Sequence, residues 1–122
     1  CDAGKKLRDL CWRVRDVTAK DIAEALEDDP ALIAAVDKGN VNGKTSLMAV
    51  AQLRDDTDAL EVLLEHGANP MLSTSRGHTA LIYAAGRGRL ASVRVLLEAG
   101  ARARVMTVNG DTAFGLAHER LR

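Results

Sequence analysis

The sequence predicts an all-α fold, a short solenoid of helix pairs joined by β-hairpin-like links. Blocks of sequence recur at a spacing of 33 or 34 residues, which is the first sign of a repeat architecture. A threonine precedes one recurring apolar stretch, as at a helix start, and a glycine follows the other, as at a helix end. Helix pairs this short cannot bury their apolar faces alone, so stacking of successive pairs must complete the core.

Two separate blocks share this period. The first contains Thr45, Thr79 and Thr112, which are 34 and then 33 residues apart, and it occupies residues 43–51, 77–85 and 110–118. The second block occupies residues 62–68 and recurs at 95–101, an offset of 33. We therefore divide the chain, as a single domain, into an atypical N-terminal capping unit, two full repeats and a partial repeat, at 1–39, 40–73, 74–106 and 107–122.

The N-terminal unit has a degraded pattern that is still helical. Residues 5–15 and 19–28 are predicted as helices, and residues 30–35 as one more helical turn before a hairpin at 37–43. Leu7, Leu10, Cys11 and Val14 form the apolar stripe of the first helix, and Ile22, Ala25 and Leu26 that of the second. Trp12 is expected to pack as core or rim.

Each full repeat is predicted to contain two helices. Thr45 and Thr79 cap the first helix of their units, and small residues inside it allow close helix approach. The second helix ends at Gly67 or Gly100, which can adopt the left-handed conformation found just past a helix. Its apolar residues recur at a 3/4 spacing that makes an apolar stripe, formed by Leu60, Leu63 and Leu64 in one unit and Leu90, Val93, Leu96 and Leu97 in the next. Leu63, Leu64, Leu96 and Leu97 are expected to be buried between helix layers. Phe114, Leu116 and Leu121 fit a first helix in the partial repeat.

Composition agrees with one small globular domain. The chain has 122 residues, 47% of them hydrophobic and 28% charged, with 17 basic and 17 acidic side chains. No apolar run approaches the ~20 residues of a membrane-spanning helix. Cys1 and Cys11 would be ~15 Å apart on a helix, too far for a disulfide, which favours an intracellular location in the cytoplasm or nucleus. The three histidines have no metal-ligand spacing, so we expect neither metal nor cofactor.

Enzyme chemistry is poorly supported. Residues 81–91 could be read as a strand followed by G-x-G-x-x-A, a permissive dinucleotide fingerprint, but the equivalent positions one repeat earlier lack the glycines and no acidic residue ends a second strand. Cys11 lies on an apolar stripe, where cysteine is usually inert packing. His66 fits a helix end better than a catalytic base. The sequence therefore predicts a non-enzyme.

Nucleic-acid binding is the alternative function. Net charge is unevenly spread, at +3 over residues 1–20, −8 over 21–66 and +5 over 67–122. Basic clusters of this kind suit a phosphate backbone. The chain has only three aromatic residues for base stacking, however, and its acidic middle would repel a duplex lying along the array.

The repeat pattern resembles that of the ankyrin repeat family, approximately D-x-x-G-x-T-P-L-H-x-A-A followed by a second helix ending L-L-x-x-G-A. The resemblance covers residues 40–122. The family's proline is replaced by Ser46, Ala80 and Ala113, and its histidine, which helps tie neighbouring hairpins by hydrogen bonds, by Met48, Ile82 and Gly115. The resemblance implies a non-catalytic protein–protein interaction module, monomeric or weakly self-associating, that binds a protein or peptide partner through its concave face.

Matching each unit to the family pattern places the partner-binding residues on the hairpin tips and the inward side of each first helix. These are Val41, Asn42, Lys44, Gln52, Leu53, Ser75, Arg76, His78, Arg87, Val108, Asn109, Asp111, Glu119 and Arg120. Arg76, His78 and Arg87 form a basic part beside an uncharged part near Gln52 and Leu53. We therefore expect the partner to offer an acidic residue next to an apolar anchor.

Overall fold

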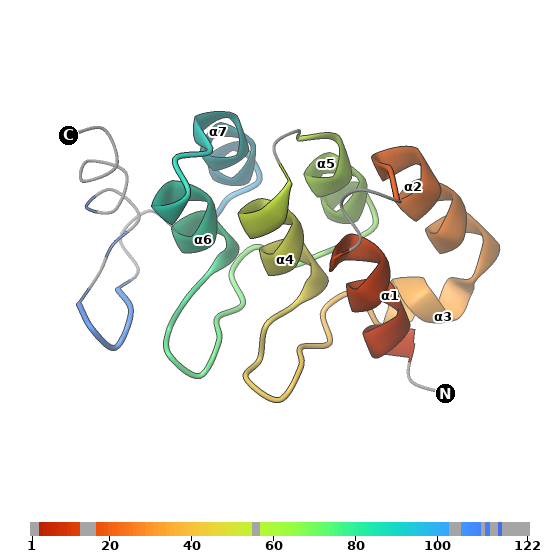
Figure 1. Cartoon of the computed structure of the whole chain (residues 1–122), viewed down its shortest axis with the longest axis horizontal. Coiled ribbons are helices and arrows are strands. Elements are labelled where there is room, and N and C mark those ends of the chain that lie inside the picture. Colours follow the sequence, from red (N-terminus) through yellow and green to blue (C-terminus); the bar gives the residue numbers. More distant parts are fainter. Residues whose placement is uncertain are drawn as a thin grey trace.

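Two rows of helices, with loops projecting below them, make up the molecule (Figure 1). The structure, a computed structural model, describes residues 3–12, 17–54, 57–102, 106–110, 112 and 115. Within these residues it contains α1 (Ala3–Trp12), α2 (Ala19–Asp28), α3 (Pro30–Ala34), α4 (Ser46–Leu53), α5 (Asp58–Glu65), α6 (Ala80–Gly86) and α7 (Leu90–Glu98). The described part holds no named strand, only isolated bridges between Ser73 and Thr79 and between Met106 and Thr112. The all-α solenoid prediction is confirmed.

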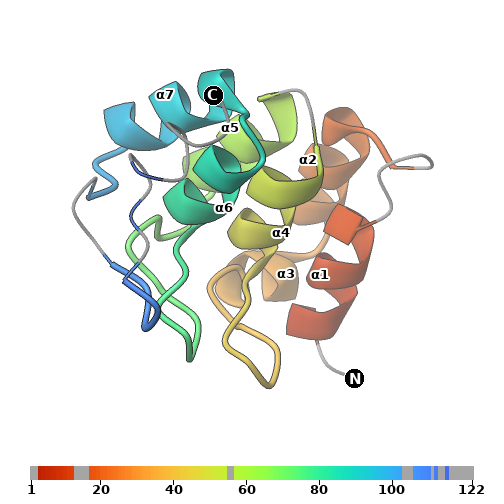
Figure 2. The same ribbon diagram turned by 60° about the vertical axis from the view of Figure 1, so that its left-hand side comes forward.

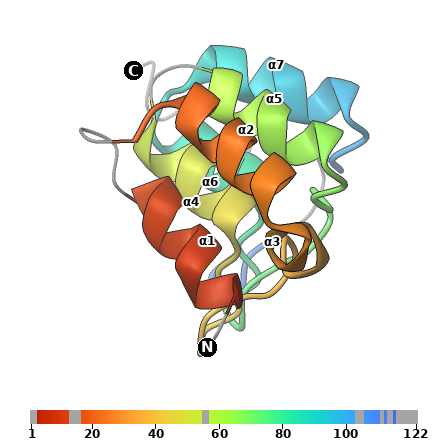
Figure 3. The same cartoon turned by 90° about the vertical axis from the view of Figure 1, so that its right-hand side faces the viewer.

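The helices stack as pairs. Helix α4 packs between α1 and α6 in one row, while α5 packs against both α2 and α7 in the other (Figure 3). The short α3 closes the N-terminal end against α1 and α2. Helix α1 spans a shorter described range than the predicted 5–15, because residues 13–16, Val14 among them, lie outside the described part. The unit boundaries remain predictions.

Local capping explains where the first helices begin. The Thr45 hydroxyl accepts a hydrogen bond from the backbone N–H of Met48, and the Thr79 hydroxyl accepts one from Ile82. The Thr112 hydroxyl accepts a similar bond from Gly115, although most of the following residues lie outside the described part. The threonine prediction is confirmed for α4 and α6.

Helix ends follow the predicted glycines. Gly67 and Gly100 have φ of 92° and 96°, in the left-handed region that glycine adopts without strain. His66 is the C-cap residue of α5, and its Nδ1 lies 2.8 Å from the carbonyl oxygen of Val62. This confirms the expectation that His66 serves a helix end.

The second helices bury only part of the predicted stripe. Leu60, Leu63 and Leu96 are fully buried, and Leu64 is half-buried. Leu97, however, is 44% exposed, so its predicted burial is wrong, and Leu90 of the same stripe is 53% exposed. Helix α5 packs against a described helix on each side, α2 and α7, whereas α7 packs against α5 and α6 and no described helix follows it.

The hairpins are joined by backbone hydrogen bonds. Ser75 donates its N–H to the carbonyl oxygen of Asn42 at 2.9 Å, and Val108 donates to that of Arg76 at 2.9 Å. Gly77, with φ of 82°, lies so close to the next hairpin that an added Cβ would be 3.1 Å from the Thr107 Cα. Consecutive hairpins therefore stack side by side below the helices (Figure 2).

Met48 does not tie neighbouring hairpins. Its Sδ accepts a hydrogen bond from the Thr45 N–H at 3.5 Å, within its own unit. This agrees with the expectation drawn from the replaced histidine.

Arg54 and Arg89 each lie in the turn that follows the first helix of a helix pair, and each connects its own pair to the preceding one. Arg54, which is only 4% exposed, donates hydrogen bonds to the carbonyl oxygens of Leu10 and Cys11 at the end of α1. Arg89 donates to the carbonyl oxygen of Gln52 near the end of α4, at 3.0 Å. Each arginine thus satisfies carbonyl groups that a helix end leaves without an intrahelical partner.

Candidate functional site

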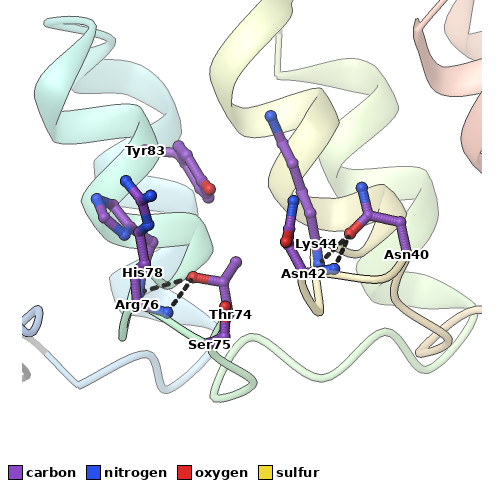
Figure 4. A pocket seen from close by; sticks show the side chains of 8 residues that line it. All are labelled: Asn40, Asn42, Lys44, Thr74, Ser75, Arg76, His78 and Tyr83. Atoms are coloured by element: carbon purple, nitrogen blue, oxygen red, sulfur yellow. Dashed lines mark hydrogen bonds between the residues drawn. The ribbon is translucent and has the colours of Figure 1, made fainter.

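A groove runs from the hairpins along the exposed side of α6. It consists of two adjoining cavities of about 280 and 240 Å³, which share His78 and Tyr83. We call it the hairpin groove. Its lining comprises Asn40, Asn42, Lys44, Gln52, Thr74, Ser75, Arg76, His78, Ile82, Tyr83, Gly86 and Arg87. Figure 4 shows the larger cavity between the two hairpins.

Side chains at the base of each hairpin hold the two sides of the groove. The Asn40 Oδ1 accepts hydrogen bonds from the backbone N–H groups of Asn42 and Lys44, at 2.9 and 3.1 Å. One unit later, the Thr74 Oγ1 accepts from Arg76 and His78, at 3.3 and 3.2 Å (Figure 4). These bonds fix the backbone of the hairpins that carry Lys44 and His78, so the groove is built on ordered local structure.

Lys44 crosses the groove wall between two aromatic rings. Its Nζ lies 4.7 Å from the centroids of both the Trp12 and Tyr83 rings, and it donates a hydrogen bond to the Gln52 Oε1. Both ring distances lie within the range of cation–π attraction. Burial lowers the pKa of Lys44, and the positive charge of Arg87 lowers it further. Trp12, 48% exposed, packs at the rim, one of the two predicted positions.

Tyr83 forms the centre of the groove. Its ring stacks on that of His78, with centroids 5.3 Å apart and planes inclined by 27°. Burial raises the pKa of Tyr83, while a hydrogen bond from Thr74 and the charge of Arg76 act in the opposite direction. The charge of Arg76 therefore acts on the Tyr83 hydroxyl, and the charge of Arg87 acts on Lys44, which contacts the Tyr83 ring.

Seven of the predicted partner-binding residues line the groove. They are Asn42, Lys44, Gln52, Ser75, Arg76, His78 and Arg87. Val41 is 99% exposed at a hairpin tip, and Leu53 is half-buried and does not line either cavity. Val108 and Asn109 are exposed on the next hairpin, while Asp111, Glu119 and Arg120 lie outside the described residues.

Four lining residues with substantial side chains were not predicted: Asn40, Thr74, Ile82 and Tyr83. Tyr83 was detectable in principle, because the equivalent position of the preceding unit holds the much smaller Ala49. Ala49 is fully buried, but an aromatic ring of this size must extend toward solvent. The part of the groove near Gln52 was expected to be uncharged. It carries the Lys44 ammonium group, which donates a hydrogen bond to the Gln52 side chain.

The structure contradicts the alternative enzyme sites. Residues 80–86 form helix α6, so the strand required before the dinucleotide fingerprint is absent from this segment. Cys11 is fully buried, and burial raises its pKa to about 12 against the opposing charge of Arg54. Such a thiol is almost wholly protonated near neutral pH and is a poor nucleophile. Among the described residues, no group of His, Cys, Asp or Glu side chains could hold a metal ion.

The described helices give no candidate for a membrane crossing, since each is too short or too polar.

Comparison with known proteins extends the repeat region toward the N-terminus, to residues before position 40. A family model of three ankyrin repeats matches residues 17–117. A putative ankyrin repeat protein, L92, of Acanthamoeba polyphaga mimivirus is 29% identical over 87 residues, which cover 67% of this chain and 21% of that protein. The chain thus spans about a fifth of the length of this curated relative.

Proposed function

Because the chain belongs to the ankyrin repeat family, whose repeats are generally non-catalytic protein-interaction modules, we propose that it binds a protein or peptide segment in the hairpin groove. The observation that supports this proposal is the composition of the groove. Its lining combines three basic side chains, Lys44, Arg76 and Arg87, with the half-buried aromatic ring of Tyr83. A lining of this kind suits an acidic residue flanked by an apolar one.

The two kinds of contact have different roles. Arg76 and Arg87 are exposed and can attract an acidic segment over a distance, which increases the association rate. The half-buried Tyr83 ring offers apolar surface in the adjoining cavity, where burial of a partner side chain slows dissociation. The apolar anchor is therefore assigned to Tyr83 rather than to Leu53, which does not line the groove.

Nucleic acid is the weaker candidate. The Tyr83 ring stacks on His78 and is also contacted by Lys44, so it is already engaged and is a poor platform for a base. Two other arginines of the basic segment 67–122, Arg94 and Arg102, line separate cavities elsewhere. Arg94 and Arg102 therefore do not extend the cations of the hairpin groove into one track for a phosphate backbone.

The proposal is tested by selecting peptides from a random display library on the immobilised chain. Selected peptides should contain an acidic residue next to an apolar one. Replacing Arg76 and Arg87 together by glutamate should slow association and flatten its dependence on salt, because the attractive field is reversed. The matched control is Arg94→Glu with Arg102→Glu, which makes the same change in net charge outside the groove.

Association kinetics at two salt concentrations separate the outcomes. A loss confined to the Arg76 and Arg87 variant supports the groove. Equal losses in both variants would show a diffuse field instead of a site. A loss confined to the control would move the interface to another face. Circular dichroism and melting of each variant verify that the fold is retained.

We also propose a cellular location and an assembly state for the chain. We place it in the cytoplasm or nucleus, where the fully buried Cys11 thiol would stay reduced, and we expect a monomer or weak self-association. Sedimentation of the purified chain at two concentrations tests the second point.

A further inference from the structure

Resting on the proposed function, we infer that the hairpin groove binds a phosphorylated side chain of the partner peptide beside Tyr83, and that Lys44, Arg76 and Arg87 are the groups that recognise it. The inference concerns the place where the two cavities meet at Tyr83: Lys44 and Arg76 line the larger cavity, and Arg87 lines the adjoining one. It adds a chemical class of ligand, a dianionic oxyanion carried on a peptide, to the general expectation of an acidic partner.

The first argument is the charge of the lining. Among the described residues that line the groove, none is acidic, so no carboxylate in the wall neutralises its cations. The Lys44 Nζ lies 4.7 Å from the centroid of the Tyr83 ring, Arg76 lines the larger cavity together with Tyr83, and Arg87 lines the adjoining cavity together with Tyr83. The positive groups therefore act on a common space around the Tyr83 ring, and an anion placed there would relieve their mutual repulsion.

The second argument is the number of charges. A glutamate or aspartate brings one negative charge, whereas a phosphoserine or phosphothreonine brings about 1.5 to 2 near pH 7, with three strong acceptor oxygens. Three cationic side chains exceed what one carboxylate can neutralise, and a phosphate neutralises more of their charge than a carboxylate does. Arginine guanidinium groups also bind phosphate oxygens in a bidentate geometry, which adds specificity.

The third argument is the presence of neutral donors beside the cations. The Asn42 amide and the Ser75 hydroxyl line the same cavity, and both can donate hydrogen bonds. The hairpins are held in place by the Asn40 and Thr74 bonds, so these donors need little rearrangement. A cavity of about 280 Å³ can admit a phosphorylated side chain with adjoining backbone.

The source of the phosphate is assigned to a peptide because of the adjoining cavity. The second cavity, with Tyr83 and Gly86, provides apolar surface that a free ion cannot use. A peptide can occupy both cavities at once, so its two contacts strengthen each other.

The test uses arrays of peptides that are randomised around a fixed central residue, which is phosphoserine, glutamate or serine in matched sets. The best peptide of the phosphoserine set is resynthesised with each of the three centres and titrated by fluorescence anisotropy. We expect the phosphoserine form to bind at least about tenfold more tightly than the glutamate form, which corresponds to about 1.4 kcal/mol. Inorganic phosphate should compete only weakly.

Matched variants locate the effect. Arg76→Gln with Arg87→Gln should remove the preference for phosphoserine, while Arg94→Gln with Arg102→Gln should retain it. Lys44→Gln should reduce it as well, provided that melting shows a folded protein. The glutamine variants keep a polar side chain of similar length, so a change in preference reports the lost charge.

Other results would overturn the inference in distinguishable ways. Equal binding of the glutamate and phosphoserine forms would leave the proposed function standing and refute phosphate recognition. Inorganic phosphate that competes as strongly as the phosphopeptide itself would show a free-anion site. A preference that survives loss of Arg76 and Arg87 would place the site elsewhere. Failure of all three peptide sets to bind would refute the proposed function together with the inference.

Discussion

The helix junctions and the hairpin groove use arginine in opposite ways. At the junction between α1 and α4, the buried Arg54 donates to the carbonyl oxygens of Leu10 and Cys11, and Arg89 does the same for Gln52 at the next junction. In the groove, Arg76 and Arg87 are exposed and face no acidic residue among the described lining. The junctions therefore use charge for stability within the chain, whereas the groove keeps charge available for a ligand.

The largest expected effect comes from the packed helix layers. Leu96→Ala should lower the free energy of unfolding by about 2 to 5 kcal/mol, because it removes a fully buried side chain and leaves a cavity. Leu97→Ala, at a position that is 44% exposed, should cost less than about 1 kcal/mol. Urea denaturation of both variants measures the difference. Similar losses would show that the assigned register of α7 is wrong.

The junction arginines should come next. Arg54→Met retains an unbranched side chain but leaves the carbonyl oxygens of Leu10 and Cys11 without this donor, and it should cost about 1 to 3 kcal/mol. Arg89→Met should cost about 0.5 to 1.5 kcal/mol, because Arg89 is only partly buried. Thermal unfolding gives both values. A larger loss at Arg89 than at Arg54 would reverse the ranking of the two junctions.

Cys11 provides a pH-dependent probe of the first junction. Because its pKa is raised from 9.0 to about 12, the unfolded chain loses the thiol proton first. The resulting stability is fully present below about pH 9 and is lost as the pH rises toward 12. In a Cys1→Ser background, iodoacetamide at pH 8 should modify the folded protein at least about a hundredfold more slowly than the urea-unfolded chain.

The control for this effect is Cys11→Ala, which should weaken the loss of stability between pH 9 and 12. Rapid alkylation of the folded protein would show that the α1–α4 junction opens readily. That result would contradict the contrast drawn between a closed junction and an open groove.

The smallest effect on stability is expected in the groove itself. Arg76→Glu with Arg87→Glu should change the free energy of unfolding by less than about 0.5 kcal/mol, because both side chains are exposed. Removing Arg87 also relieves its repulsion of Lys44. Thermal melting at low salt tests this directly. A loss as large as that of Arg54→Met would mean that the groove arginines are structural.

Local signals in the sequence predicted most of the fold. The period of the threonines and glycines located α4 to α7, because capping and left-handed turns depend on residues close in the chain. Periodicity alone could not predict the exposure of Leu97, which depends on whether another helix covers α7. Seven predicted residues do line the groove.

The parts of the site that were missed depend on long-range contacts. Lys44 contacts both the Tyr83 and the Trp12 rings, and the carbonyl groups to which Arg54 donates are 43 and 44 residues away in the chain. Leu53 follows the family pattern but does not line the groove. Such pairings become visible only when neighbouring units have been stacked.

Arg54 also has a consequence for how the molecule folds. It belongs to the second unit, yet it completes the hydrogen bonding at the end of α1 in the first, and Arg89 stands in the same relation to α4. A helix pair that forms alone leaves its last carbonyl groups without this donor until the next pair docks. Neighbouring pairs are thus energetically coupled, and a chain with one pair formed is disfavoured relative to both the unfolded and the complete array. Unfolding should accordingly be all-or-none across the junctions rather than a stepwise loss of single repeats.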